Sequence, residues 1–281
     1  ILFFTTKGIC HKMKVYKLPL GTPQAKGKAF INLLALEQGE TISVVMPLPE
    51  DESTWDKLNV IFATSHGTVR RNSLEDFQNV RANGLIAMKL EGDETLIDVR
   101  TCTDKDDIVL STRKGKAIRF SVEDLRVFKS RASTGIRGIK LGDGDEIMSI
   151  SIVRHVDVTA EERMAYLKRA SQLRNQVEDA EADTDDEETS ATAITLSDER
   201  FNELAKMEDF LLAITSKGFG KRTSAYEYRT TGRGGSGIKN MKLSKKNGEI
   251  VGSFHVHDSD DVMLVTNGGQ IIRMPVKDIR F

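Results

Sequence analysis

Basic residues recur at one position of a repeated phrase, and basic side chains are the groups that neutralise phosphates. Each phrase is an apolar run ending in Thr, then Gly three positions later, then Lys or Arg four positions after the Gly. The five basic positions are Lys12, Arg71, Arg119, Arg222 and Arg273. Because Lys and Arg make up only 41 of the 281 residues, five matches at one position are not a chance result. The sequence predicts five equivalent cations on one rim of a closed structure.

Further bases lie beside these positions or in the segment that joins the two halves of each repeat. They are Arg70, Lys116, Lys221, Arg131, Arg137, Arg229, Arg233 and Lys239. One interpretation is that Lys and Arg on edge strands only block sheet-to-sheet aggregation. The other is a track for a polyanion with regularly spaced charge, which means duplex nucleic acid. No base-reading helix or finger motif is visible, so the contacts would go to phosphates and be largely independent of sequence.

If these cations are exposed, their removal should weaken DNA binding and alter folding stability little, because exposed charges contribute weakly to folding. We expect this of a triple change at Arg71, Arg119 and Arg222.

The spacing of the repeated phrases predicts the strands and turns that carry these basic residues. Successive repeat glycines lie about fifty residues apart, except for one interval of about two units that should contain an insert. Each apolar run is short and does not alternate, which is typical of a strand buried on both faces. The repeat Gly then closes a tight hairpin, and a second Gly begins another strand pair. These second glycines are Gly84, Gly135, Gly237 and, more loosely, Gly27. Four strands per repeat predict an all-β, propeller-like disc of four-stranded blades.

Charge marks the insert within the single domain of residues 1–281. The chain has 41 basic and 42 acidic residues, but residues 157–210 hold 16 acidic against 6 basic ones. Thr159 and Glu162 have capping-box spacing, and Ser197 could cap a second helix. Apolar residues at helical spacing are Tyr166, Ala170, Leu173 and Val177 in the first helix, and Phe201 and Leu204 in the second. We therefore expect a helical hairpin at 157–210.

The tip of this hairpin is EDAEADTDDEETS, residues 178–190, which is too acidic and too poor in apolar residues to fold alone. Three roles stay open for the insert: a solvated surface excursion, a regulatory acidic segment that competes with an anionic ligand, and a helix pair that binds a partner.

Residues typical of catalysis or metal binding form no set. His255 and His257 could share one strand face, but no third ligand accompanies them. Cys10 and Cys102 lack ligand spacing, and we expect reduced packing residues. No apolar span of about twenty residues and no signal-peptide pattern is present, so nothing indicates a membrane or secretion. The chain starts inside a strand and stops where a repeat lacks its second half, so we expect a piece of a longer polypeptide.

Several phrases resemble the C-terminal domain of the DNA gyrase A subunit, from a bacterial type IIA topoisomerase. They are KVYKLP (Lys14–Pro19), INLLALEQGE (Ile31–Glu40), FATSHGTVRRNSLEDF (Phe62–Phe77), KGKAIRFSVEDLR (Lys114–Arg126), ASTGIRGIKLGDGDEI (Ala132–Ile147), GFGKRTSAYEYRTTGRGGSGIKNMK (Gly218–Lys242) and NGEIVGSFHV (Asn247–Val256). The resemblance covers the whole chain except the insert. It implies a β-pinwheel, a disc whose blades exchange strands and whose rim binds and bends duplex DNA, so that gyrase can introduce negative supercoils.

The resemblance also implies where the chemistry and the partners lie. A tyrosine in the N-terminal part of the gyrase A protein cleaves DNA, and the gyrase B protein hydrolyses ATP, so ATP and Mg²⁺ belong to the holoenzyme and no cofactor to this chain. The expected partners are duplex DNA, the rest of the gyrase A protein and the gyrase B protein in a heterotetramer, without a membrane. The expected location is the bacterial cytoplasm, at the nucleoid.

Two departures from the family pattern matter. The family has six blades, and this chain has five opening phrases, so the first blade is missing. With it goes the Gln-Arg-Arg-Gly-Gly box that locks the wrap; GRGGSG (Gly232–Gly237) is only a relative of that box. Two alternatives remain: the corresponding domain of topoisomerase IV, and a propeller scaffold for protein partners of the kelch or WD type.

Overall fold

The computed structural model describes residues 1–22, 24–131, 133–177 and 194–281. Its strands follow the repeats. They are β1 (Leu2–Thr5), β2 (Ile9–Lys12), β3 (Ile42–Met46), β4 (Asn59–Thr64), β5 (Thr68–Ser73), β6 (Leu85–Ile86), β7 (Leu96–Cys102), β8 (Asp106–Thr112), β9 (Lys116–Ser121), β10 (Ile136–Arg137), β11 (Ile147–Arg154), β12 (Phe210–Thr215), β13 (Gly220–Ser224), β14 (Ile238–Lys239), β15 (Ile250–Val256), β16 (Asp261–Val265) and β17 (Ile271–Pro275).

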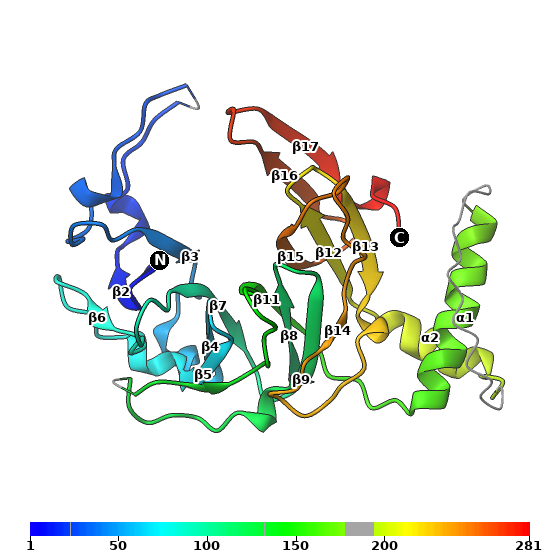
Figure 1. Cartoon of the computed structure of the whole chain (residues 1–281). Coiled ribbons are helices and arrows are strands. Elements are labelled where there is room, and N and C mark those ends of the chain that lie inside the picture. Colours follow the sequence, from blue (N-terminus) through cyan, green and yellow to red (C-terminus); the bar gives the residue numbers. More distant parts are fainter. Residues whose placement is uncertain (23, 132, 178–193) are drawn as a thin grey trace.

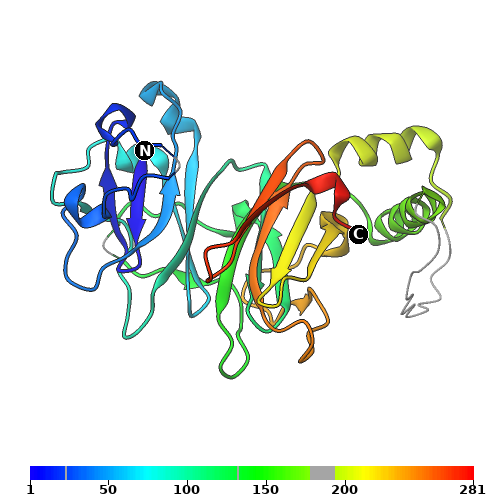
Figure 2. The ribbon, with the colours of Figure 1, turned by 90° about the horizontal axis from the view of Figure 1, so that it is seen from above.

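Five antiparallel blades stand in an open arc (Figure 1). From the concave side outward, the strand orders are β3-β1-β2-β6, β7-β4-β5-β10 and β11-β8-β9-β14. The fourth blade is β15-β12-β13 and the fifth is the pair β16-β17 within the described residues. Strands β3, β7, β11 and β15 pack against one another in sequence along the concave side (Figures 1 and 2). The opposite, outer edges of the blades form the surface that we call the rim.

Strand exchange builds the rim. The outermost strand of each of the first three blades comes from the following repeat: β6 pairs with β2, β10 with β5, and β14 with β9. This exchange confirms the expected β-pinwheel, and it explains why a repeat alone cannot complete a four-stranded sheet.

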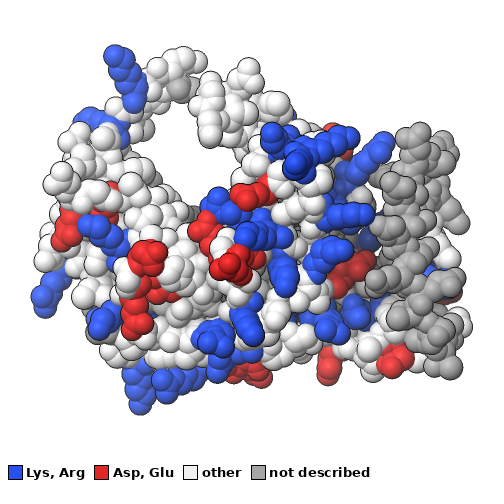
Figure 3. Space-filling model, viewed as in Figure 1, with Lys and Arg blue, Asp and Glu red and all other residues white. Residues whose placement is uncertain are grey.

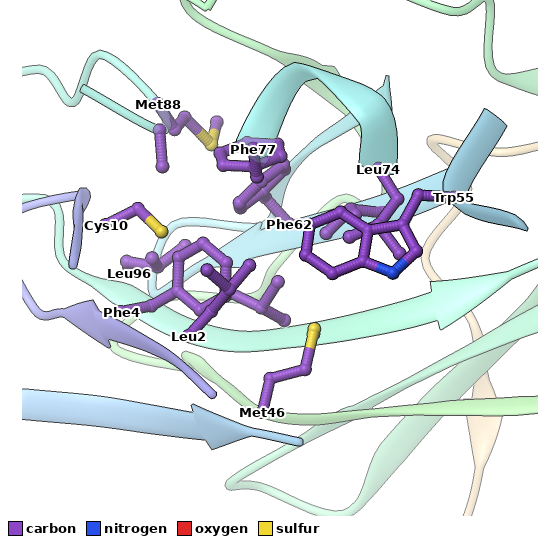
Figure 4. Packing of buried hydrophobic residues seen from close by; sticks show 13 residues of the cluster. Leu2, Phe4, Cys10, Met46, Trp55, Phe62, Leu74, Phe77, Met88 and Leu96 are labelled. Atoms are coloured by element: carbon purple, nitrogen blue, oxygen red, sulfur yellow. The ribbon is translucent and has the colours of Figure 1, made fainter. Parts of the chain in front are cut away.

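Apolar side chains join the blades. The opening strands β1, β4, β8 and β12 are almost fully buried, as their unbroken apolar runs predict. Between the first two blades, Phe4 meets Phe62 and Phe77 at ring-centroid distances of 5.7 and 5.9 Å (Figure 4). Each fully buried Phe contributes about 1.5–3 kcal/mol, so the blade interfaces are the core of the molecule.

Two kinds of glycine permit the exchange. The repeat Gly115 has φ +85°, and a Cβ there would lie 2.8 Å from the carbonyl oxygen of Met241 in the incoming segment. At Gly237, with φ +71°, a Cβ would lie 2.5 Å from the carbonyl oxygen of Ala117. Of the strand pair expected after Gly27, the first strand is wrong, because Phe30–Asn32 forms a 3-10 turn, whereas the second is present as β3. By the repeat register this segment should cross to a neighbouring hairpin, and none of the described residues supplies one.

The insert lies between β11 and β12. It contains α1 (Ala160–Val177) and α2 (Asp198–Met207), as the sequence predicts. The capping box is present, because Thr159 and Glu162 each accept the other's backbone N–H at 3.1 Å. Ser197 Oγ likewise accepts the backbone N–H of Arg200 at 3.2 Å.

The two helices pack on the fourth blade. Tyr166, Ala170, Phe201 and Leu204 form one cluster with Tyr226 of that blade. The expected inward position of Leu173 is wrong, because it is 47% exposed, whereas Tyr166 and Ala170 of the same helix are buried in this cluster. The side chain of Val177 and the acidic segment 178–190 lie outside the described residues.

Candidate nucleic-acid interface

Most of the equivalent repeat cations are buried rather than exposed. Arg71, Arg119 and Arg222 are only 5%, 4% and 4% exposed, and Lys12 is half-buried. Arg273, in the fifth blade, is exposed. The prediction of a solvent-facing ring of five charges is therefore wrong for the first four positions, and the reason lies at the junctions between blades.

A short 3-10 turn follows the second hairpin strand of each of blades two to five. These turns are η4 (Leu74–Phe77), η5 (Val122–Asp124), η6 (Ala225–Glu227) and η7 (Val276–Asp278). The cation of the preceding blade donates to backbone carbonyls at each turn. The bonds are Lys12 to Gln78 at 2.9 Å, Arg71 to Val122 and Leu125 at 3.1 Å each, Arg119 to Ala225 at 2.7 Å, and Arg222 to Lys277 at 3.3 Å and to Ile279. We call these four residues the inter-blade staples.

Each staple is also neutralised by a carboxylate. Lys12 pairs with Glu52 at 2.7 Å, Arg71 with Asp104, and Arg222 with Asp258 at 2.6 Å. These three acids lie in the linkers between repeats. Arg119 uses Asp107 on its own blade at 2.8 Å, and Asp107 is fully buried. A buried guanidinium needs such compensation, so the staple position is defined by its acid and by the next turn together.

Arg70 is buried as well, so its expected exposure is wrong too. Its guanidinium donates to the carbonyls of Arg131 and Ser133 at 2.7 and 2.6 Å, in the segment that leads to β10. Burial lowers the pKa of Arg70 to about 10, so it stays protonated at neutral pH. Arg70 holds the crossing segment in place.

Four of the predicted bases are exposed on rim strands: Lys116, Arg137, Lys221 and Lys239. Lys116 on β9 stands directly opposite Lys239 on the exchanged strand β14. Like charges directly opposite each other destabilise a sheet, and an anion lying along the edge would relieve that repulsion. Figure 3 shows Lys and Arg side chains gathered over the region of β13 and β14.

Three predicted bases belong to the crossing segments between blades. Arg131 is half-buried and donates to the carbonyl of Asp76 at 2.6 Å. Arg233, its equivalent one repeat later, donates to the carbonyls of Asp124 at 3.3 Å and Arg137 at 3.1 Å, yet stays exposed. Arg229 is exposed. All three residues border the rim, and the guanidinium groups of Arg131 and Arg233 also bond to backbone carbonyls of the blades.

One set of exposed cations was missed at the sequence level. Lys89, Lys140 and Lys242 each lie five residues after the second Gly of their repeats, and all three are exposed. The signal was the repeated ending MKL, IKL, MKL, whose apolar residues indicated strands while its Lys passed unnoticed. These lysines stand just beyond the exchanged strands and extend the set of rim bases.

The described residues contain no group of three or more His, Cys, Asp or Glu that could hold a metal ion. His255 and His257 do share a face, with ring centroids 4.5 Å apart. Cys10 and Cys102 are free and buried, and burial raises the pKa of the Cys102 thiol to about 12. Neither described helix is long and apolar enough to span a bilayer.

Sequence comparison identifies relatives of the whole chain. The sequence model of the family described as "DNA gyrase C-terminal domain, beta-propeller" matches residues 1–49, 58–103, 106–154, 209–257 and 260–281, and leaves out the insert. The DNA gyrase A subunit of Granulibacter bethesdensis is 48% identical over 290 residues, covering all of this chain and 31% of that protein. The corresponding Rickettsia bellii protein is 44% identical over 280 residues, covering all of this chain and 30% of that protein. The chain thus spans about a third of the length of the curated relatives it matches.

Solved structures share the fold at lower identity. A C-terminal domain of DNA topoisomerase IV has a TM-score of 0.69 at 20% identity, covering all of this chain and 70% of that one. A DNA gyrase A C-terminal domain has a TM-score of 0.69 at 18% identity, covering 99% of this chain and 73% of that one. Fold alone does not separate the two, but the family match and the identities above 40% across the chain do. The chain therefore belongs to the family of DNA gyrase C-terminal domains.

Proposed function

We propose that this chain binds duplex DNA along its rim and bends it, as a non-catalytic part of the gyrase A protein. The observation that carries the proposal is the exposed Lys116–Lys239 pair. Two lysines held opposite each other on an outer edge fit a polyanion better than they fit a free surface.

The repeat extends this contact along the arc. Lys89, Lys140 and Lys242 place an exposed cation after each of the three exchanged strands, and Arg137 adds another on β10. A duplex that met these bases in turn would follow the convex edge and would have to bend. The contacts would be to phosphates, so affinity would depend little on base sequence.

Membership of the gyrase family supplies the wider setting of the proposal. The bend would support negative supercoiling by an ATP-dependent type IIA topoisomerase, which contains the rest of the gyrase A protein and the gyrase B protein, in the bacterial cytoplasm. ATP and Mg²⁺ would act in those other parts. The topoisomerase IV alternative rests on fold similarity below 25% identity, so the gyrase assignment is the better supported one.

The test is DNA affinity as a function of salt. If about six phosphates are neutralised, log K should fall with log salt at a slope of roughly −5. Changing Lys116 and Lys239 together to Ala should make the slope shallower by about 2. Anisotropy of a labelled duplex at several salt concentrations measures both.

The matched control is Lys105→Ala. Lys105 is exposed and lies in the same blade, but just before β8, at the end of the hairpin opposite Lys116. Its loss should leave the slope unchanged. Absence of binding at low salt, or a slope insensitive to the Lys116 and Lys239 changes, would leave a protein scaffold as the better interpretation.

A further inference from the structure

We infer that the inter-blade staples Lys12, Arg71, Arg119 and Arg222 are positioning residues that fix the angle between successive blades and so set the curvature of the rim. The inference rests on the proposed function, because it concerns the DNA bend, but its first consequence can be measured without DNA. It assigns these cations to shaping the rim rather than to touching phosphates.

At the Arg71 and Arg119 junctions, each staple is attached to the next blade at two points. Arg71 contacts the next blade with both its backbone and its side chain. Its carbonyl accepts the N–H of Phe128 at 2.8 Å, and its Nη1 donates to the carbonyls of Val122 and Leu125. Arg119 does the same with the N–H of Thr231 at 2.9 Å and the carbonyl of Ala225. Two attachments several bonds apart restrain rotation of one blade against the next.

The turns that receive the staples are rim elements. Each 3-10 turn begins where the second hairpin strand of its blade ends, so its orientation fixes that strand and the crossing segment that follows. The third junction keeps the arrangement despite the insert, since Arg119 and Ala225 are 106 residues apart in sequence. The restraint therefore passes from blade to blade along the described arc.

Lys12 shows that a staple can be a lysine as well as an arginine. A Lys has one charged nitrogen, and Lys12 uses it for both Gln78 and Glu52. A cation that reaches one carbonyl and one acid is thus sufficient in the first junction. Arg→Lys changes should retain part of the restraint elsewhere, whereas Arg→Ala changes should lose it.

The first arm of the test uses protein without DNA. Spin labels at Glu91→Cys and Asn267→Cys sit on exposed turns of blades two and five, so the pair spans the junctions of Arg71 and Arg222, and the native Cys10 and Cys102 are buried. We expect the Arg71→Ala/Arg222→Ala variant to broaden the distance distribution between the labels, and the corresponding Lys variant to restore part of its sharpness. An unchanged distribution in the Ala variant would overturn the inference.

The second arm measures the bend of a duplex labelled at both ends, by energy transfer at saturating protein. We expect the Ala variant to reduce the bend while its salt slope stays that of the parent. The Lys116→Ala/Lys239→Ala variant should do the reverse, with a shallower slope and an unchanged distance distribution between the spin labels. A shallower slope in the Arg variant would mean that the staples contact phosphates, contrary to the inference.

A second variant covers the case in which the Arg changes prevent folding. The side chains of Asp104 and Asp258 are each 65% exposed, so Asp104→Asn/Asp258→Asn should fold while loosening Arg71 and Arg222. Broadening in this variant supports the inference, and a sharp distribution contradicts it. If the parent chain does not bind DNA at all, the proposed function is wrong. The distances between the spin labels, measured without DNA, still test the role of the staples.

Discussion

At the residue scale, two basic residues three positions apart on one strand have opposite surroundings. Lys116 points to solvent at the rim, whereas Arg119 is enclosed by Asp107, Ala225 and the carbonyl of Arg154. The two side chains carry the same charge, so charge alone does not decide between the two roles. What decides is whether the next blade offers carbonyl oxygens within reach.

The stability of the Arg119→Ala variant follows from this enclosure. Removing the guanidinium leaves Asp107 buried without an arginine partner, with His155 Nδ1 still 2.8 Å away. Breaking a buried ion pair from one side costs about 3–5 kcal/mol. We expect a loss of that order in the free energy of unfolding, measured by urea denaturation. Lys116→Ala is the control and should change it by no more than about 0.5 kcal/mol. Equal, small effects for both variants would show that Arg119 is in fact exposed.

This reverses our sequence-based expectation, and the missing information can be named. The period located the position of every staple correctly, but burial was misjudged because the acceptors are main-chain carbonyls, which a sequence does not display. A weaker signal was present: Glu52, Asp104 and Asp258 recur in the linkers between repeats. Acids placed regularly against a regular cation favour an internal pair over a free phosphate site.

At the element scale, the sequence predicted the helices of the insert, but it did not predict how they pack on the fourth blade. The capping residues Thr159 and Ser197 act within four residues of themselves, so sequence spacing suffices to find them. The docking partner Tyr226 is separated from Tyr166 by 60 positions, and its hydroxyl donates to the carbonyl of Leu204 at 3.0 Å. Such contacts follow from the blade geometry alone.

The base of the insert is closed by Asp209 and Arg154. Asp209 accepts the backbone N–H of Arg154 at 2.7 Å and its guanidinium at 2.7 and 3.0 Å. Burial alone would raise the pKa of Asp209, but hydrogen bonds from His255 and Arg154 outweigh it and hold that pKa well below its usual value.

The depressed pKa gives Asp209 a pH-dependent contribution to stability. A carboxyl whose pKa is lower when folded stabilises above its unfolded pKa, about 3.9, and that contribution is lost as pH falls further. Asp209→Asn should therefore be less stable than the parent at neutral pH. The difference should shrink below about pH 4. Urea unfolding at a series of pH values measures it, and a gap that stays constant down to strongly acidic pH would contradict the assignment.

At the scale of the whole molecule, the proposed function raises the question of whether the arc would bend the DNA or the DNA would open the arc. Bending a site of 20–30 bp by 40–90° costs about 1–6 kcal/mol. A hydrogen bond to a charged group contributes about 1.5–3 kcal/mol, and each Arg staple makes more than one bond. Together with the apolar contacts between blades, the junctions withstand a bend of that cost. The curvature of the arc would therefore be imposed on the duplex.

The first helix of the insert lies beside rim bases. Leu167 and Ser171 of α1 line a cavity of about 400 Å³ together with Lys221 and Lys239, so the helix that leads to residues 178–190 stands beside rim bases. That segment is rich in Asp and Glu and contains no base. A tethered polyanion acts at high effective concentration, so it would compete with DNA for the same cations.

Replacing residues 178–190 with a neutral Gly/Ser linker should then tighten DNA binding at low salt. The gain should fade as salt rises, because at physiological ionic strength charges are screened over about 8 Å. A linker of the same length that keeps every acidic residue but scrambles their order is the matched control, and it should bind as the parent does. Salt titrations of the three chains with one labelled duplex measure the effect. Equal affinities for all three at every salt concentration would leave the insert as a solvated excursion that takes no part in DNA binding.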